Sequence, residues 1–161
     1  MKVLVTGAGG FIGSRLANKL VLEGHQVFGT IHDSPSQVNE MQIINVDLTE
    51  DGFEIPDEKF DVVFHLAAAT PLVKDKKKQK KINFDGTVNL FNKVKDKTDF
   101  IIYASGLGVF GNPNGVVDEQ SPIKPETDFV KIRLDAQKFL EESCKNNNIG
   151  FSVCYFGDVY G

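Results

Sequence analysis

The chain has 161 residues, a length that suits one domain with a hydrophobic core. Its formal net charge of −4 gives no overall basic surface for nucleic acid, and no apolar run is long enough to cross a bilayer. The hydrophobic fraction of 41% and the charged fraction of 25% are typical of a soluble globular protein. Cys144 and Cys154 lack the spacing of a metal site and fit a reducing compartment, so we expect a cytoplasmic protein without a metal.

The first predicted strand, Lys2–Thr6, runs directly into the glycine turn Thr6–Gly13 and then into a helical pattern. Gly7 permits a tight turn, Gly10 lets the backbone approach a pyrophosphate, and Gly13 lets the helix pack closely on the strand. The N–H groups at the helix start, at Phe11, Ile12 and Gly13, would then face the phosphates. An ordinary glycine turn is the alternative, but the flanking strand and helix favour a dinucleotide-binding turn.

Strands and helices alternate along the rest of the chain. We predict six strands, at Lys2–Thr6, Gln26–Ile31, Gln42–Val46, Asp61–Leu66, Phe100–Ala104 and Phe151–Tyr155. Helical patterns cover Phe11–Glu23, Lys76–Lys95 and Asp128–Asn147. Alternating βα units predict an α/β fold with a doubly wound, Rossmann-like parallel sheet and helices on both faces. Residues 1–161 are expected to form one domain, with the cofactor at the carboxyl ends of the strands.

The segment Lys74–Lys81 carries six of the basic residues. It is compatible with an anionic ligand or a partner surface, but a solvated start of a helix is the interpretation we favour.

The glycine turn and several later segments resemble the extended short-chain dehydrogenase/reductase family, the NAD-dependent epimerases and dehydratases. The resemblance covers the whole chain in collinear order. It rests on Thr6–Gly13, Asp47-Leu48, the segment Asp61–Ala68 that ends in Leu66-Ala67-Ala68, Asn83 within an Asn-x-x-Gly-Thr segment, Phe100–Gly111 and Val159-Tyr160-Gly161. It implies that Asp47 and Leu48 lie against the adenine, and that Leu66, Ala67, Ala68 and Asn83 belong to the cofactor site.

Each of these positions also has an interpretation without a function. Asp47 could be a turn former at a strand end, and Asn83 a cap or turn residue. His65, in an apolar strand, is more simply a hydrogen-bonded core histidine than a catalytic one.

The positions that carry catalysis in this family differ here. The resemblance implies a Tyr as general acid/base, a Lys four residues later and a Ser or Thr on the turn after the fifth strand. These positions hold Phe129, Arg133 and Gly106, and no Tyr-x-x-x-Lys occurs anywhere in the sequence. Phenylalanine cannot donate a proton and glycine cannot hydrogen-bond through a side chain, so we expect the usual mechanism to fail. Ser105 remains a weak catalytic candidate, and Arg133 could still hold the ribose hydroxyls.

The choice between NAD and NADP is finely balanced in the sequence. Asp33 follows the last glycine of the turn by twenty residues, close to where an acid binds the ribose 2′-OH of NAD. His32 stands where a related branch has an Arg that grips the 2′-phosphate of NADP, and an imidazole is mostly neutral near pH 7. We favour NAD slightly.

Family members continue beyond the sixth strand into a smaller domain that closes over the substrate. Because the sequence ends at Gly161, we expect that substrate domain to be lacking. An apolar edge left there would favour a homodimer or a missing second segment. We therefore predict an NAD(P)-binding protein with weak or no standard oxidoreductase activity. The alternative is an active epimerase, dehydratase or reductase that uses other residues or a missing C-terminal part, on a sugar nucleotide or small carbonyl.

Overall fold

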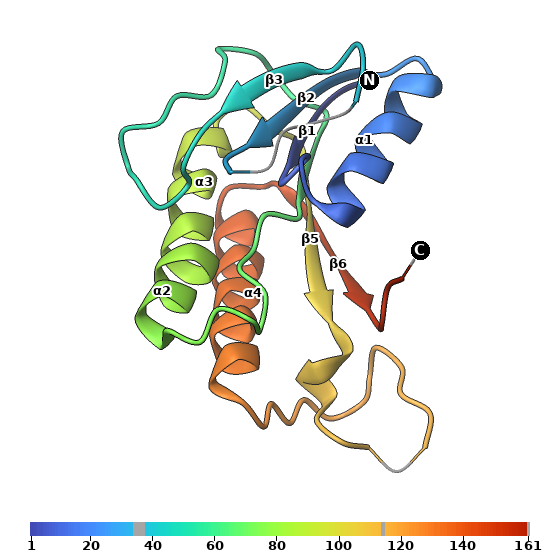
Figure 1. The fold of residues 1–161 in the computed structure, drawn as a ribbon, viewed down its shortest axis with the longest axis vertical. Helices are drawn as coiled ribbons and strands as arrows, with labels where there is room; N and C mark the ends of the chain where they lie inside the picture. Colours follow the sequence, from blue (N-terminus) through green and yellow to red (C-terminus); the bar gives the residue numbers. More distant parts are fainter. Residues whose placement is uncertain (34–37, 114, 161) are drawn as a thin grey trace.

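The computed structural model describes residues 1–33, 38–113 and 115–160. Within these ranges one sheet holds six parallel strands in the order β3-β2-β1-β4-β5-β6 (Figure 1). The strands are β1 (Lys2–Thr6), β2 (Gln26–Ile31), β3 (Gln42–Asn45), β4 (Val62–His65), β5 (Phe100–Gly106) and β6 (Gly150–Phe156). This order reverses at β1, between β2 and β4, so the predicted doubly wound parallel sheet is confirmed.

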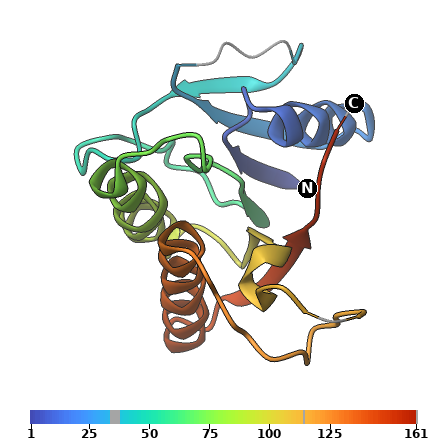
Figure 2. The same cartoon turned by 60° about the horizontal axis from the view of Figure 1, so that its bottom comes forward.

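Helices cover both faces of the sheet, as the alternation of strands and helices predicts (Figures 1 and 2). The helix α1 (Phe11–Leu22) packs on one face, and α3 (Gly86–Val94) and α4 (Asp128–Asn146) pack on the other. The strand β1 shows how the two layers form, because its side chains alternate between them. Val3 and Val5 are buried with α1 residues, whereas Leu4 is buried in the larger core beneath α3 and α4.

The single helix predicted over Lys76–Lys95 is wrong in detail, because its middle is a π-helical turn. The short helix α2 (Lys76–Lys80) leads into the π turn Lys81–Asp85, which continues as α3. A π turn adds a residue to the helical repeat and re-aims the side chains within it, often at functional sites. Here the turn contains the buried Asn83.

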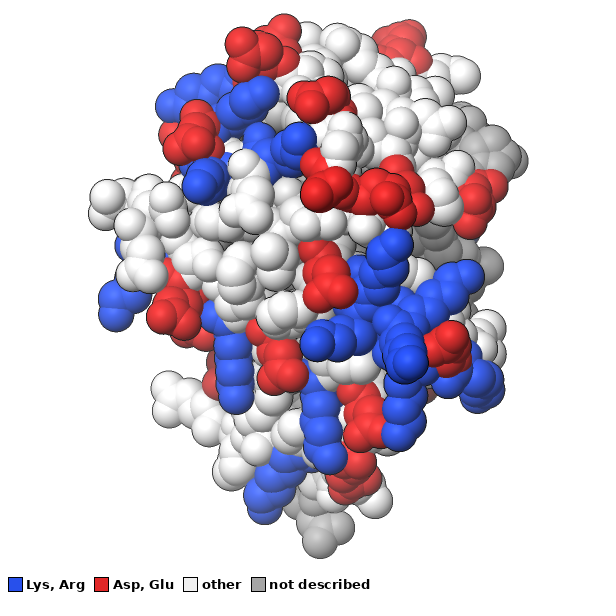
Figure 3. All heavy atoms as spheres, turned by 90° about the vertical axis from the view of Figure 1, so that its left-hand side faces the viewer, with Lys and Arg blue, Asp and Glu red and all other residues white. Residues whose placement is uncertain are grey.

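The basic run Lys74–Lys81 forms the solvated start of this helical region. The Asp75 side chain caps α2 by accepting from the backbone N–H groups of Lys77 and Lys78. Lys76 pairs with Asp128 at the start of α4, and Lys81 pairs with Glu50. Figure 3 shows basic side chains gathered on the face that carries α2 and α3, with acidic side chains between them.

The last two strands are longer than the sequence pattern indicates. Their parallel pairing continues from Phe100 opposite Gly150 to Gly106 opposite Phe156. On the α1 side, an apolar groove of about 480 Å³ separates α1 from β4, β5 and β6. Its strand residues include Phe64, Ile102, Cys154 and Phe156, and the Cys154 side chain is exposed there. No described helix therefore packs over this part of the sheet face.

Candidate functional site

A cleft of about 1010 Å³ lies over the carboxyl ends of β1, β4, β5 and β6. Its walls come from the glycine turn, the loop after β4, the turn after β5, the start of α4 and the segment after β6. Eight of the residues predicted to bind a cofactor line it: Gly7, Gly10, Phe11, Ile12, Gly13, Leu66, Ala68 and Arg133. The position agrees with the rule that ligands of open α/β sheets bind where the strand order reverses.

The glycine turn needs its glycines at two positions for steric reasons. Gly7 has a φ of +69°, and a Cβ there would lie 2.9 Å from the backbone of Ala67. A Cβ on Gly13 would lie 2.1 Å from the carbonyl oxygen of Gly7. With any side chain at residue 13, α1 could therefore not lie this close to the turn after β1. At Gly10 a Cβ would meet only the Gly7 oxygen, at 3.2 Å. The missing side chain of Gly10 therefore leaves space beside the start of α1.

A buried hydrogen-bond network around His65 fixes the loop that follows β4. The Thr6 hydroxyl accepts from the backbone N–H groups of Leu66 and Ala67, each at 3.1 Å. The Thr87 hydroxyl donates to the Asn83 carbonyl at 2.8 Å, so it accepts from His65 Nε2, also at 2.8 Å. His65 Nδ1 then accepts from the Thr6 hydroxyl at 2.8 Å. The donor and acceptor roles of these groups therefore determine the protonation of the imidazole: His65 is neutral, with its proton on Nε2.

This network supports the interpretation of His65 as a hydrogen-bonded core residue. Burial, and secondly the positive charge of Arg133, lower the pKa of His65 from 6.5 to about 3. The imidazole does not line the cleft. Its contribution is to join β1, β4 and the helix after the π turn.

Asn83 acts on the same loop from the π turn. Its side-chain oxygen accepts from the Ala69 backbone N–H at 2.8 Å, and its amide nitrogen donates to the Ala69 carbonyl at 3.5 Å. Both side-chain groups are thus used on the backbone, and Asn83 lies behind the cleft wall. Ala67 also has no side chain in the cleft, but its backbone touches Gly7.

The predicted adenosine residues gather beside the cleft, where β2 and β3 end. His32 Nδ1 lies 3.2 Å from Asp33 Oδ2, and His32 Nε2 lies 3.7 Å from Asp47 Oδ2. Burial raises the pKa of Asp47, but hydrogen bonding from Thr49 and the nearby charges of His32 and Lys81 outweigh it. The pKa of this carboxyl therefore lies below its usual value. Leu48 packs against α3, opposite Gly86, and its carbonyl accepts from the Asn89 amide at 3.0 Å.

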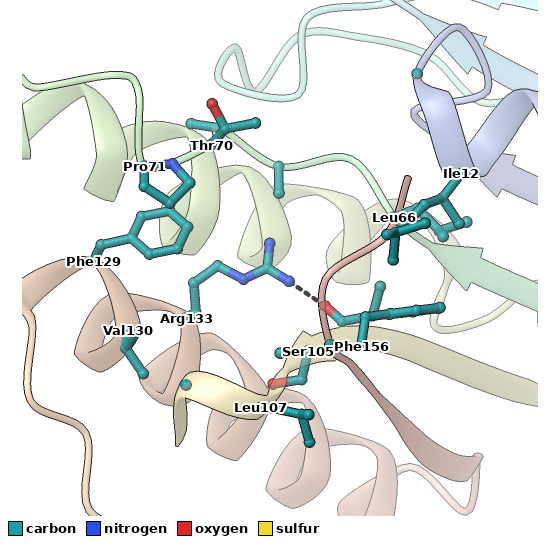
Figure 4. Close-up of a pocket in the computed structure, with 18 of the residues that line it drawn as sticks. Ile12, Leu66, Thr70, Pro71, Ser105, Leu107, Phe129, Val130, Arg133 and Phe156 are labelled. Atoms are coloured by element: carbon teal, nitrogen blue, oxygen red, sulfur yellow. Dashed lines mark hydrogen bonds between the residues drawn. The ribbon is translucent and has the colours of Figure 1, made fainter. Parts of the chain in front are cut away.

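The three positions expected to carry catalysis meet at the other half of the cleft (Figure 4). Arg133 extends from α4 across the cleft and donates through Nη2 to the Ala104 carbonyl. The Phe129 ring lies beside Pro71, one helical turn before Arg133. Gly106 has an extended backbone, and a Cβ there would be 3.7 Å from the Phe156 carbonyl oxygen, an ordinary contact. The site thus has space for a side chain at residue 106 that the sequence does not fill.

Ser105 reaches the cleft wall, but its hydroxyl is enclosed. The residue is 5% exposed, and its Oγ has no hydrogen-bond partner among the residues described. The same holds for Gln137 Oε1, on α4. An enclosed hydroxyl is poorly placed to hydrogen-bond a substrate, whereas a side chain on residue 106 would point into open space.

Of the described residues that line the cleft, none is a tyrosine. Tyr103 is buried under α4 and donates its hydroxyl to the Arg133 carbonyl at 3.2 Å. Burial raises the pKa of Tyr103, against a smaller opposing effect of the Arg133 charge. The Tyr155 hydroxyl accepts from the Gln137 amide at 3.0 Å, and Tyr160 is 91% exposed beyond β6.

Sequence reasoning missed several residues at the site. Thr70 and Thr127 line the cleft with hydroxyl groups, and Thr6 and Thr87 complete the His65 network. Thr127 could have been found as the residue before the helical pattern, because threonine is a common N-cap and its hydroxyl here accepts from the Val130 N–H. Thr70 follows β4 by five residues in an irregular loop, and no periodic pattern marks it.

The described part of the chain contains no cluster of His, Cys, Asp and Glu side chains that could hold a metal ion. A search of the same residues finds no helix with the length and apolar character needed to cross a membrane.

Comparison with known proteins gives a consistent result over the whole chain. A model of the NAD dependent epimerase/dehydratase family matches residues 3–161. A UDP-glucose 4-epimerase of Mycolicibacterium smegmatis is 28% identical over 181 residues, covering 100% of this chain and 57% of its own length. One from Lactobacillus helveticus is 26% identical, with coverages of 100% and 52%.

Solved structures agree with these relatives. The crystal structure of UDP-glucuronic acid 4-epimerase from Bacillus cereus in complex with NAD has a TM-score of 0.82 and 30% identity to this chain. The match covers 100% of this chain and 57% of that one. The chain therefore spans about half the length of the relatives it matches.

The neutral state of His65 predicts a loss of stability in mild acid. The unfolded chain binds a proton on this imidazole below about pH 6.5, whereas the folded chain does so only near pH 3. Stability therefore falls as the pH drops between these values, with a contribution of about 1.4 kcal/mol per pH unit. Denaturant unfolding at a series of pH values should show a shallower dependence for His65→Gln than for the wild type. The variant His25→Gln is the control, and identical slopes for all three proteins would contradict the assignment.

Proposed function

This chain belongs to the NAD dependent epimerase/dehydratase family, and from that premise we propose that it binds NAD in the cleft. The observation that carries the proposal is the space beside Gly10, between the Gly7 backbone and the start of α1. The helix α1 has no side-chain cap, so the N–H groups of its first turn are free to donate to a pyrophosphate. A structure of a relative of 30% identity holds NAD, which supports the same conclusion.

We assign the adenosine half of NAD to the ends of β2 and β3, and the nicotinamide half to the region of Ser105, Phe129 and Arg133. This orientation follows from the doubly wound sheet, whose two halves each receive one nucleotide. The Asp33 and Asp47 carboxylates at the adenosine end suit a ribose hydroxyl and oppose a 2′-phosphate. They favour NAD over NADP.

When bound, the nicotinamide ring would supply a hydride acceptor or donor. The chain's own residues supply no acid/base group at the expected positions, because Phe129 has no titratable proton and Gly106 has no side chain. A guanidinium is a donor of hydrogen bonds with no acceptor atom, so Arg133 can orient neighbouring acceptors and does not supply the missing acid/base group. We therefore propose a nucleotide-binding role with little or no standard oxidoreductase activity. A cytoplasmic location, expected from the two free cysteines, stays a prediction.

Binding can be tested by calorimetric titration of NAD and NADP against the wild type and Gly10→Ala. Alanine fits the Gly10 backbone, whose φ is −81°, but its methyl group occupies the space assigned to the pyrophosphate. We expect the wild type to bind NAD more tightly than NADP, and the variant to bind NAD at least about tenfold more weakly. Gly52→Ala is the matched control, since nothing lies within 4 Å of a Cβ there. Absence of NAD binding by a folded wild type would refute the proposal.

Catalysis can be tested by incubating the chain with NAD and a UDP-hexose while recording NADH absorbance and the sugar products. Because the expected acid/base positions hold Phe129 and Gly106, we expect neither reduced cofactor nor epimerised sugar above the level of a no-protein control. Hydride transfer that disappears in Ser105→Ala, but persists in Ser121→Ala outside the cleft, would instead establish Ser105 as a catalytic residue.

A homodimer is a separate proposal, supported by the apolar groove beside α1. Parallel sheets are normally covered on both faces, and the groove residues Ile102, Cys154 and Phe156 leave part of one face open. A second copy that packs its own groove there would bury both surfaces.

Sedimentation equilibrium tests the dimer directly. We expect the mass of two chains for the wild type and of one chain for Cys154→Glu, because a charge in an apolar contact is costly. Leu72→Glu should stay dimeric, since Leu72 is 82% exposed and lies outside the groove. A monomeric wild type would rule out this interface.

A further inference from the structure

The run Lys74–Lys81 concentrates positive charge in a chain that is otherwise acidic. It holds six lysines and one aspartate, a formal charge of +5, whereas the twelve basic and twenty-one acidic residues elsewhere give −9. All six lysines are exposed. Exposed charges are largely screened beyond about 10 Å at ordinary salt, so a partner that meets this face experiences mainly the charges of the run and its immediate neighbours.

The structure leaves four of the six lysines without an ion pair. Lys76 pairs with Asp128 and Lys81 with Glu50, but the other lysines have no carboxylate partner among the described residues. Asp75, the one acidic residue within the run, accepts from backbone N–H groups at the start of α2. The run therefore presents ammonium groups whose charge is not matched by a neighbouring carboxylate.

An exposed apolar side chain lies beside these lysines. Leu72 is 82% exposed, two residues before the run, and it follows Pro71, which is also exposed. A single exposed leucine needs no explanation by itself. Next to a lysine cluster, however, it matches an interfacial pattern in which an apolar side chain enters a lipid headgroup layer while the lysine ammonium groups stay at its surface.

We propose that Leu72 and the run Lys74–Lys81 dock the protein on a lipid surface that carries anionic headgroups. The cations of the run are all lysines, whereas planar, bidentate recognition of bases and phosphates in nucleic acid favours arginine. The run also contains no aromatic residue on which bases could stack. Neither the cleft nor the apolar groove includes a residue of the run, which disfavours an acidic peptide held in a groove.

Docking of this kind brings one wall of the cleft close to the lipid surface. The loop that carries Leu72 also supplies Thr70 and Pro71 to the cleft. Dinucleotide binding is not required for docking, since none of the lysines of the run lines the cleft. The contact is peripheral and needs no segment that crosses the bilayer.

Vesicle flotation tests the docking surface. The wild type is mixed at about 0.1 M salt with vesicles of phosphatidylcholine alone or with about 30% phosphatidylglycerol. We expect binding to the anionic vesicles only, and its loss at about 0.5 M salt, where the attraction is screened. The double variant Lys77→Gln/Lys78→Gln should bind at least about tenfold more weakly, because each lysine near an anionic surface contributes about fivefold.

The matched control is Lys138→Gln/Lys145→Gln, which removes the same charge from exposed positions on the later turns of α4. It should bind the anionic vesicles as the wild type does. Leu72→Ser keeps every charge and should bind about fivefold more weakly, because it lacks the apolar side chain that enters the headgroup layer. Circular dichroism verifies that each variant is folded.

Three results would overturn the proposal: no binding of the wild type to anionic vesicles, unchanged binding by the Lys77/Lys78 variant, or unchanged binding by Leu72→Ser. Binding of a mixed-sequence DNA duplex or of polyglutamate in place of the vesicles would also overturn it, in favour of a nucleic acid or an acidic peptide as the partner.

Discussion

The fold depends on backbone contacts at Gly7, where three segments meet without a side chain between them. The carbonyl of Gly7 touches the start of α1 at Gly13, and its Cα faces the backbone of Ala67 after β4. The approach of Ala67 requires glycine at residue 7, whose φ is positive, and the approach of the Gly7 carbonyl requires glycine at residue 13. These contacts draw α1 and the β4 loop to the end of β1. The cleft lies where they meet.

The Thr6–His65–Thr87 network has a related role on the buried side of the same loop. Each of its hydroxyls both donates and accepts, and the imidazole bridges β1 and α3 in one tautomer. An unpaired buried polar group costs free energy, so this fully paired arrangement favours one position for the loop that includes Ala67. Asn83 adds a second tie at Ala69. The side chains of Thr6, His65, Thr87 and Asn83 thus position the loop after β4, although none of them lines the cleft.

Much of the fold could be predicted because its signals are local. Apolar alternation located the strands to within a few residues, and the glycine spacing located the turn before α1. The π turn Lys81–Asp85 could not be predicted from local periodicity, and its Asn83 side chain pairs with Ala69, fourteen residues away in sequence. The Thr6–His65 pairing has the same character, because it joins strands that are 59 residues apart in sequence. At the site, the sequence predicted that Phe129 and Arg133 occupy the expected catalytic positions. The hydrogen bond from Arg133 to the Ala104 carbonyl became known only from the structure.

The extended backbone at Gly106 has a consequence for how the cleft could be changed. A glycine there is not demanded by a turn or by crowding, because a side chain would meet only an ordinary contact. Phe129 likewise differs from tyrosine by one oxygen atom, on a helix whose course does not depend on it. At both positions the difference from the residue expected there thus lies in a side chain, and at Gly106 the backbone would accept another residue. A side chain could be placed at residue 106 without rebuilding the turn that follows β5.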